Sequence, residues 1–421
     1  MATSQKQKSK NALVDFKEMN KINILFLHKF KVIAGAEMFL IELIKTINRA
    51  KFRPMVCLIA DTCEHAYDIL EKEKIKIFGD LLTNNDSKPK GFLGDKIASI
   101  TFIKRFLNLQ GKTLPCDIKA ILNLTNILKR EKIHILFYID QHAALNLAPL
   151  CAILARTPLL IGSFHTQGLR ISIIEKLLLS ATDKFMVTSS YHGKYLVDFL
   201  HIPSEKIKVI NNGISIDRFK KFSVNMLKKE NFAIDSDTSI VGIVARLVPD
   251  KCHEIFLESA VTILKVLPDT HFFIIGNGPE RVRLEEMSIE LNISSNVHFL
   301  GFREDIPSLL SLLDVSVLSS CAEFFPYSLL ESMMMEIPVV ATDVGAVSEV
   351  VYNGVTGILV PSKNSNALAE AILLLLKDRE LAKKMGREGR KRVINRFSAQ
   401  KMTSQIESIF QDLKNFKKIK T

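Results

Sequence analysis

The sequence has no tryptophan, only six cysteines and no long apolar run. The cysteines are scattered, form no CxxC pair and show no zinc-like spacing with histidine, so we expect buried, reduced thiols in a cytoplasmic protein and no metal site. They are Cys57, Cys63, Cys116, Cys151, Cys252 and Cys321. No stretch of about 18 apolar residues is present, which argues against a transmembrane helix.

The first 20 residues also lack an apolar segment, and we expect a disordered tail there rather than a signal peptide. The net charge of +12 is compatible with anionic substrates, an anionic membrane surface or nucleic acid. Nucleic acid is the least favoured of these partners, because the Lys and Arg residues are spread out and no nucleic-acid-binding module is recognisable. We therefore predict no nucleic-acid partner.

Two blocks of short, β-rich apolar runs alternate with helix-like segments. The first block has runs at 21–28, 53–60, 134–140, 158–165, 184–190 and 206–213, and the second at 240–247, 271–278, 297–302, 315–320, 338–343 and 357–361. This alternation is typical of parallel sheets covered by helices, so the fold class is α/β with two doubly wound, Rossmann-like domains. In such folds ligands bind at the carboxyl ends of strands, and we expect a ligand in a cleft between the domains.

The predicted domain limits follow the polar interruptions of this pattern. They are a tail at 1–20, an N-terminal acceptor-side domain at 21–218, a polar linker at 219–238, a C-terminal nucleotide-sugar-binding domain at 239–397 and a final helix at 398–421.

Two basic residues follow the first strand of the second block. Arg246 and Lys251 stand five positions apart in "GIVARLVPDK", where the strand gives way to a Pro-Asp loop. A diphosphate suits such a pair, since Arg offers a planar fork of donors and Lys a compact charge. A solvated basic loop is the alternative.

Glycines mark two further turns of interest. In "FFIIGNGPERVRLEE" a strand, a Gly-x-Gly turn and a helix start follow one another, and Gly35 lies between the first strand and the first helix of the chain. Free N–H groups at a helix start suit anions, although tight-turn glycines explain the same letters. The third glycine of a dinucleotide fingerprint is missing, which argues against a dehydrogenase.

Two acids bracket the segment "EFFPYSLLE". We expect Glu323 in the loop before a helix that starts near Pro326, and Glu331 in the second turn of that helix. Each carboxylate could accept hydrogen bonds from two adjacent sugar hydroxyls, so the pair could hold both ends of a nucleotide sugar. A capping acid and a helix-dipole acid form the alternative.

Two other features are ambiguous. His165 ends a strand of the first block, where a structural histidine and a site histidine are both plausible. The "DSD" at 235–237 looks like a metal-binding DxD motif, but it precedes a strand and lies in the predicted linker, so we interpret it as a turn.

Together these segments resemble the family-4 retaining glycosyltransferases of GT-B fold, over about residues 22–50 and 160–397. The motifs are "GIVARLVPDK", "GNGPE", "HFLGFREDIPSLLSLLDVSVLSS", "EFFPYSLLESMMMEIPVVATDVGAVSEVV" and the interdomain "KIKVINNGISIDRF". The resemblance implies two Rossmann-like domains facing a central cleft, with a C-terminal helix that crosses back to the first domain.

The resemblance also implies a role for each candidate residue. Arg246 and Lys251 would hold the donor diphosphate, Glu331 the nucleotide ribose, and the backbone at Phe302–Arg303 the base. Glu323, with the N–H groups of Phe325, Pro326 and Tyr327, would contact the transferred sugar, while Gly35 would approach the donor phosphate and His165 the sugar or acceptor.

Four positions depart from the family pattern. Cys252 stands where a glycine usually follows the lysine, Ala34 and Ala346 each replace one glycine of a pair, and Pro326 replaces a frequent glycine. The changes at Cys252 and Ala34 bear on the fine shape of the phosphate site, the proline is expected to be tolerated, and no change removes a charged group.

The function implied is retaining transfer of a hexose or N-acetylhexosamine from a UDP- or GDP-linked sugar to a glycan or lipid-linked acceptor, with no metal or other cofactor. Two basic side chains would stabilise the charge that develops on the diphosphate. The alternatives are a GT-B epimerase of UDP-sugars, which would release product without an acceptor, and a non-catalytic GT-B protein.

A basic, apolar stretch at 94–112 carries isoleucines and leucines at helical spacing beside Lys and Arg. Such a segment could rest on an anionic membrane near a lipid-linked acceptor, which would make a cytoplasmic enzyme peripheral to the inner face of the membrane. A helix packed on the sheet with its lysines reaching solvent is the alternative.

Overall fold

The computed structural model describes residues 21–30, 35–59, 64–79, 81, 118–139, 142–165, 173–220 and 227–417. The chain forms two compact units. The first comprises residues up to Val187, Leu196–Lys208 and the chain from Ile406 onward, and the second comprises Thr188–Tyr195 and Val209–Gln405. The predicted membrane-facing stretch at 94–112 lies outside the described residues.

The first unit is built on a seven-stranded sheet in the order β3-β2-β1-β4-β5-β6-β7. Strands β1 to β6 pair in parallel. The strands are β1 (Ile22–His28), β2 (Phe52–Leu58), β3 (Lys76–Phe78), β4 (Ile135–Ile139), β5 (Leu159–Phe164), β6 (Lys184–Val187) and β7 (Ile207–Val209). The central strand β4 is buried at all five positions, as a parallel strand covered on both faces should be.

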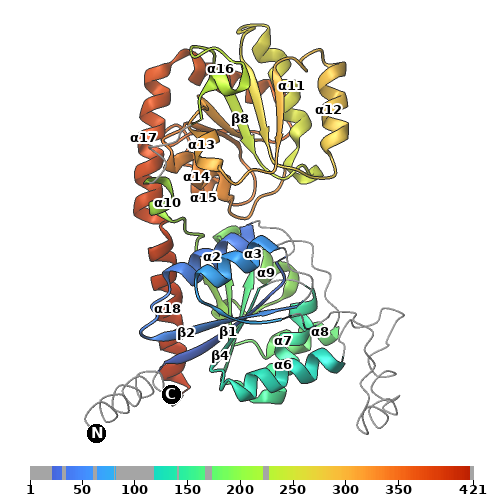
Figure 1. Ribbon diagram of the computed structural model, residues 1–421, viewed down its shortest axis with the longest axis vertical. Helices are drawn as coiled ribbons and strands as arrows, with labels where there is room; N and C mark the ends of the chain where they lie inside the picture. Colours follow the sequence, from blue (N-terminus) through green and yellow to red (C-terminus); the bar gives the residue numbers. More distant parts are fainter. Residues whose placement is uncertain are drawn as a thin grey trace, which may run out of the picture. The chain divides into compact units, whose positions relative to one another are not determined.

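Helices cover this sheet on both faces, with α2 on one face and α6, α7 and α8 along the other (Figure 1). They are α2 (Gly35–Thr46), α3 (Glu64–Lys72), α6 (Ile118–Arg130), α7 (His142–Ala155), α8 (Ile173–Ser180) and α9 (Ser190–Leu200). The apolar face of α2 is fully buried through Leu40, Leu43 and Ile44, which anchors the helix that starts at Gly35.

The second unit has a six-stranded, all-parallel sheet in the order β10-β9-β8-β11-β12-β13. Its strands are β8 (Ile240–Val244), β9 (His271–Ile275), β10 (Val297–Gly301), β11 (Val315–Leu318), β12 (Val339–Thr342) and β13 (Ile358–Val360). Its helices are α10 (Ile216–Lys220), α11 (His253–Leu264), α12 (Arg281–Glu290), α13 (Ile306–Leu310), α14 (Tyr327–Met334), α15 (Val347–Val350), α16 (Ser365–Lys377) and α17 (Arg379–Arg396).

Two apolar clusters hold the second sheet, one on each face. Val241 and Ile243 of β8 pack with Phe256 of α11 and Ile372 of α16, whereas Ile240 of the same strand packs in the other cluster, with α13. Successive residues of one strand point to opposite faces, so a strand buried on both sides has to be apolar throughout.

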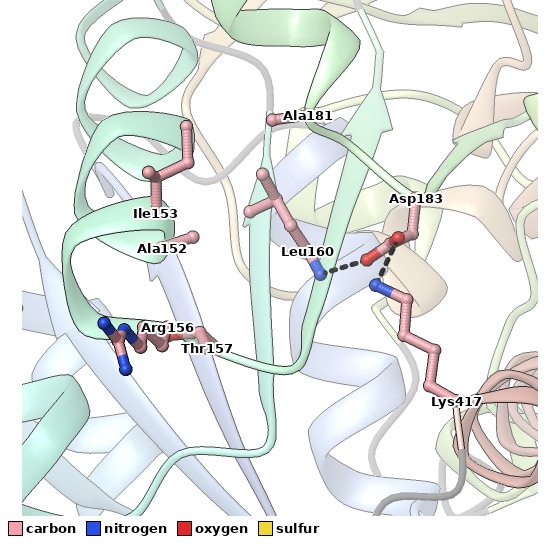
Figure 2. A pocket seen from close by; sticks show the side chains of 8 residues that line it. All are labelled: Ala152, Ile153, Arg156, Thr157, Leu160, Ala181, Asp183 and Lys417. Carbon is pink, nitrogen blue, oxygen red and sulfur yellow. Dashed lines mark hydrogen bonds and ion pairs between the residues drawn. The ribbon is translucent and has the colours of Figure 1, made fainter.

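The last helix, α18 (Ala399–Phe416), ends in the first unit. Phe410 packs edge-on against Phe52 and Phe137, with ring centroids 5.8 and 6.1 Å apart. Beyond the helix, Lys417 lies 2.6 Å from Asp183, whose other carboxylate oxygen accepts the N–H of Leu160 at 2.9 Å (Figure 2).

The unit boundary differs from the predicted one. The structure divides the chain at Lys208/Val209, ten positions before the predicted linker, and it assigns Thr188–Tyr195 to the second unit. Ile234, inside the predicted linker, is only 3% exposed and belongs to the second unit's core. A polar composition alone did not show that this segment packs on the domain that follows it.

Each of the twelve predicted strands overlaps a strand of the structure, and the described strand β3 was not predicted. Among the described cysteines, Cys57, Cys151 and Cys252 are buried, but Cys321 is exposed. No helix in the described part of the chain is long and apolar enough to cross a membrane.

Candidate functional site

The candidate residues of the second unit lie on loops at one edge of its sheet. Four adjacent strands, β9, β8, β11 and β12, run parallel, so their carboxyl ends meet at the same edge. Gly276, Arg246, Glu323 and Gly345 follow these four strands in that order. Ligands bind at this edge in open α/β sheets.

The loop that carries Arg246 is fixed by the Gly-x-Gly turn beside it. Ala245 N donates to Ile275 O at 3.0 Å, and Leu247 N donates to Asn277 O at 3.1 Å. A Cβ on Gly276 would lie 1.9 Å from Ala245 O, and one on Gly278 would lie 2.2 Å from Leu247 O. Close backbone packing therefore requires glycine at both positions. This agrees with the alternative interpretation of the motif, in which the glycines serve a tight turn and not an anion.

Arg246 lies in this loop between Ala245 and Leu247. Its side chain is exposed, and within the described ranges it makes no hydrogen bond or ion pair. A guanidinium in that position can offer its whole fork of donors to an anion.

Lys251 and Glu323 form the best-defined contact of the site. Lys251 Nζ lies 2.7 Å from Glu323 Oε1, and the same oxygen accepts the hydroxyl of Ser320 at 2.7 Å. The two side chains are 16% and 9% exposed, so the pair is largely shielded from water. Both residues were predicted from the sequence, but for different parts of the donor: Lys251 for the diphosphate and Glu323 for the sugar. The hydrogen bond from Ser320 was not predicted.

The residue after Lys251 has an unusual backbone. Cys252 has φ +48° and ψ +49°, a left-handed conformation that glycine adopts without cost and that costs other residues roughly 1–2 kcal/mol. This conformation gives the physical reason why glycine suits the position. Cys252 closes the short turn Pro249–Lys251 and precedes α11.

The backbone of Glu323 is held by the turn after β12. Ala346 N donates to Glu323 O at 3.0 Å, and Gly345, with φ +55°, leaves room for that oxygen because a Cβ would lie 1.9 Å from it. Thr342 Oγ1 donates to Ser320 O at 2.6 Å. These contacts place the carboxylate of Glu323 beside Lys251.

Glu331 lies in the second turn of α14, as predicted, with Leu329, Leu330, Met333 and Met334 buried in the core. Arg218 Nη1 donates to Glu331 Oε1 at 2.9 Å. Burial raises the pKa of Glu331, and the charge and hydrogen bond of Arg218 oppose that rise. Sequence reasoning missed Arg218, although it stands in the quoted "NNGISIDRF".

The helix start between the two acids corrects one expectation. Pro326 directly precedes the first helical residue, Tyr327, and proline has no amide hydrogen, so it cannot donate to a sugar as predicted. Phe325 is 5% exposed, and its ring packs edge-on against Phe397 with centroids 5.3 Å apart. Its carbonyl accepts Asn212 Nδ2 at 3.2 Å.

The predicted base-binding segment follows β10. Phe302 is 58% exposed, so its ring is available for contact. The guanidinium of Arg303 forms two hydrogen bonds to Asp305, at 2.8 and 2.6 Å, which raise the pKa of Arg303 and lower that of Asp305. The side chain of Arg303 is thus occupied within its own loop.

Two candidate residues, Gly35 and His165, lie in the first unit. Gly35 is the first residue of α2, and His165 directly follows β5. The ring of His165 contacts Phe39 of α2 at 4.8 Å, and Ser163 Oγ lies 2.9 Å from its Nε2. A second buried pair at this edge, His28 Nε2 and Glu37 Oε1 at 3.1 Å, was not predicted.

The opposite edges of the sheets carry other features. Asp235–Asp237 form a turn, with Thr238 N donating to Asp235 O at 3.1 Å, and they line a shallow hollow of about 660 Å³ at the amino ends of β8 and β9. In the first unit a cavity of about 200 Å³ lies beside Asp183 and Lys417, at the amino ends of β5 and β6 (Figure 2). Among the residues described, no group of three or more His, Cys, Asp or Glu could hold a metal ion.

Two family models match the chain. Glycosyltransferase Family 4 matches residues 33–218, and Glycosyl transferases group 1 matches residues 226–392. A relative in Escherichia coli, UDP-Gal:alpha-D-GlcNAc-diphosphoundecaprenol alpha-1,3-galactosyltransferase, is 23% identical over 382 residues, covering 87% of this chain and 97% of its own. N-acetyl-alpha-D-glucosaminyl L-malate synthase of Bacillus anthracis is 27% identical over 314 residues, covering 71% and 80%.

Solved structures share the fold. The crystal structure of Anabaena HepE in complex with UDP has a TM-score of 0.75 and 21% identity, over 93% of this chain and all of that one. A glycosyltransferase from Rickettsia africae has a TM-score of 0.74 and 21% identity, over 94% and 99%. With a family model on each half and this two-sheet architecture, the chain belongs to the family-4 glycosyltransferases of GT-B fold.

Proposed function

We propose that this glycosyltransferase moves a hexose or N-acetylhexosamine from a UDP- or GDP-linked sugar to a glycan or lipid-linked acceptor, with retention at the anomeric carbon and without a metal. The observation that carries the proposal is the ion pair of Lys251 and Glu323, which lies at the same edge of the sheet as the exposed Arg246. Two cations and one carboxylate at the carboxyl edge of the sheet fit a diphosphate joined to a sugar.

Arg246 and Lys251 stabilise the leaving group of the reaction. When the glycosidic bond to the diphosphate breaks, negative charge grows on the leaving phosphate, and preorganised cations stabilise this charge more in the transition state than in the ground state. Two basic side chains can do this without a metal. The leaving phosphate oxygen then accepts the proton of the acceptor hydroxyl on the same face of the sugar, which gives retention.

Glu323 and Glu331 are proposed to hold the two ends of the donor. Glu323 is fixed by Lys251 and Ser320 and would face the transferred sugar, where a carboxylate stabilises positive charge on the ring carbon. Glu331, with Arg218, would accept hydrogen bonds from the ribose hydroxyls. In the first unit, Gly35 would approach the donor phosphate and His165 the sugar or acceptor.

The relatives support the choice of substrates. The E. coli relative is named for a UDP-galactose donor and a diphosphoundecaprenol-linked acceptor, and a Staphylococcus aureus relative is a capsular polysaccharide biosynthesis glycosyltransferase. HepE was crystallised with UDP and glucose. We therefore favour an envelope polysaccharide or its lipid-linked precursor as the acceptor.

The proposal is tested by incubating the full chain with UDP- and GDP-linked hexoses and N-acetylhexosamines, with undecaprenyl-diphosphate-linked sugars as acceptors, and recording product by mass spectrometry. The anomeric configuration of the product is read by NMR. We expect transfer only with acceptor, an α product from an α-linked donor, and undiminished rates in EDTA. Inversion would contradict retention, and a metal requirement would contradict metal independence. An epimerised nucleotide sugar formed without acceptor would contradict transfer as the reaction.

A further inference from the structure

Two cysteines lie together at the edge of the donor loops, where neither has a role in the proposed transfer. Cys252 directly follows Lys251, and Cys321 stands two positions before Glu323. Both thiols are free, and both sulfurs contact one carbonyl oxygen, that of Asp250, at 4.0 Å from Cys252 Sγ and 3.4 Å from Cys321 Sγ. Cys321 is also the neighbouring thiol that acts on the pKa of Cys252.

The backbone around them is already tied together. Cys321 N donates to Asp250 O at 2.9 Å, and Ser319 Oγ donates to Lys251 O at 2.9 Å. Both sulfurs approach the same carbonyl oxygen and the two loops are hydrogen-bonded to each other, so rotation of the two side chains with a small loop adjustment can bring the sulfurs to a bond of about 2 Å.

We propose that Cys252 and Cys321 form an oxidisable dithiol, a modification site at which hydrogen peroxide joins the Lys251 loop to the Glu323 loop by a disulfide. The left-handed backbone of Cys252 supports this assignment. A non-glycine residue is strained in that conformation, and the residue that occupies it places a sulfur beside the Cys321 loop. The formation of the bond does not rest on the proposed transfer reaction; only its effect on donor binding does.

The two thiols have different parts in the chemistry. Cys321 is exposed and meets the oxidant first, whereas Cys252 is 3% exposed. Burial, together with the neighbouring Cys321 thiol, raises the pKa of the Cys252 thiol to about 12, so Cys252 is mostly protonated at neutral pH and reacts slowly with peroxide itself. Its position beside Cys321 makes it the resolving thiol, and its attack requires the loss of its proton.

The reaction has two balanced steps. The Cys321 sulfur attacks peroxide, an S–O bond forms, the O–O bond breaks and one water leaves, which gives a sulfenic acid. The Cys252 sulfur then attacks the Cys321 sulfur, an S–S bond forms, the S–O bond breaks, and the proton of Cys252 leaves with the oxygen as a second water. Two thiols lose two electrons, and peroxide is reduced to two waters.

The test is a peptide map of the full chain after treatment with hydrogen peroxide and alkylation. Trypsin cuts after Lys251 and after Lys265, so Cys252 starts its own peptide, 252–265. We expect this peptide joined to the one that contains Cys321, and separated again by dithiothreitol. Cys57 and Cys151 are buried and serve as internal controls that stay reduced. Free Cys252 beside over-oxidised Cys321, or Cys321 joined to another cysteine, would overturn the proposal.

Two variants and a binding measurement complete the design. Cys321→Ser and Cys252→Gly, the second suited to the left-handed backbone, should each remove the joined peptide. In wild type, oxidation should weaken UDP binding, measured by calorimetry, by about tenfold or more, with full recovery in dithiothreitol and no change in Cys321→Ser. Unchanged UDP binding in the cross-linked protein would overturn the link to the donor loops. If reduced protein binds neither UDP nor GDP, the donor assignment fails and the peptide map still decides the dithiol.

Discussion

Glu331 lies at a buried position beside one cationic neighbour, Arg218, which opposes the rise of its pKa on burial. The carboxylate side chain is 11% exposed and that of Arg218 28%, so their contact is only partly screened by water. Truncating Arg218 to Ala would leave a desolvated carboxylate without its partner, and we expect the free energy of unfolding to fall by about 2 kcal/mol. Chemical denaturation at pH 8 measures this change.

A double variant separates the pair from general packing. Arg218→Ala combined with Glu331→Gln should recover most of the lost stability, because the neutral amide needs no cation. If Arg218→Ala alone changes the free energy of unfolding by less than about 0.5 kcal/mol, the pair does not hold Glu331 as described.

The positions of the candidate site residues on loops and a helix of the second unit could be predicted from the sequence, but their pairing could not. Arg246, Lys251, Glu323 and Glu331 stand in short motifs with recognisable strand and loop contexts. Lys251 and Glu323 are 72 positions apart in the chain, and Arg218 and Glu331 are 113 apart. Such contacts arise from the order of strands in the sheet, and local spacing carries no information on them.

At the scale of elements, the turn after β12 positions the loop of Glu323. Gly345 has φ +55° and no room for a Cβ against Glu323 O, whereas Gly354 has φ +76° with nothing within 4 Å. Replacing either with Ala adds backbone strain, but only Gly345→Ala adds a collision with backbone. We expect losses in the free energy of unfolding of about 1 kcal/mol for Gly354→Ala and more than about 3 kcal/mol for Gly345→Ala.

Thermal and urea unfolding of the two glycine variants gives the comparison directly. Equal losses would show that backbone strain alone matters and that the close approach to Glu323 O relaxes freely. Because both glycines have a left-handed backbone, a difference between the two losses in the free energy of unfolding reports on the contact of the new Cβ at position 345 with Glu323 O.

Long strands and helices were predictable because they are apolar on both faces, as in β8 and β9, or periodic, as in α18. The short strand β3 was not predicted, because its segment KIF, with an exposed lysine, has no distinct apolar run. The glycine turn at Gly276 was recognised, but its reason was open until the structure placed Ala245 O against it. A glycine motif that serves close backbone packing cannot be distinguished in the sequence from one that serves phosphate binding.

At the scale of the molecule, histidine titration sets how stability responds to acid. Burial lowers the pKa of His134, His253, His271 and His298, to about 4 for His253. The unfolded chain binds these protons near pH 6.5, before the folded protein does, so the free energy of unfolding falls as pH falls below about 6.5. For His253 the loss reaches roughly 3 kcal/mol by pH 4. Glu331, with a raised pKa, acts in the opposite direction.

His253 offers the matched control for this pH dependence. Its ring is 1% exposed, and neither nitrogen has a hydrogen-bond partner among the described residues. His253→Leu should keep stability at pH 8 and flatten the decline between pH 6.5 and 4, as followed by urea denaturation across pH. A decline as steep as in wild type would contradict the assignment to this side chain.

In the proposed function, the cations at the edge of the second sheet hold the donor diphosphate. Arg246 tests this most directly, because its exposed side chain has no partner in the described part of the chain and its loss should leave the fold intact. Arg387, exposed on α17, provides a matched Arg→Ala control in the same unit.

The measurement is calorimetric titration of wild type, Arg246→Ala and Arg387→Ala with UDP and with GDP. A lost charge-assisted hydrogen bond of about 1.5–3 kcal/mol predicts a Kd for the bound nucleotide that is roughly 10- to 150-fold weaker in Arg246→Ala. Arg387→Ala should match wild type. A Kd in Arg246→Ala within about twofold of wild type would contradict the central claim.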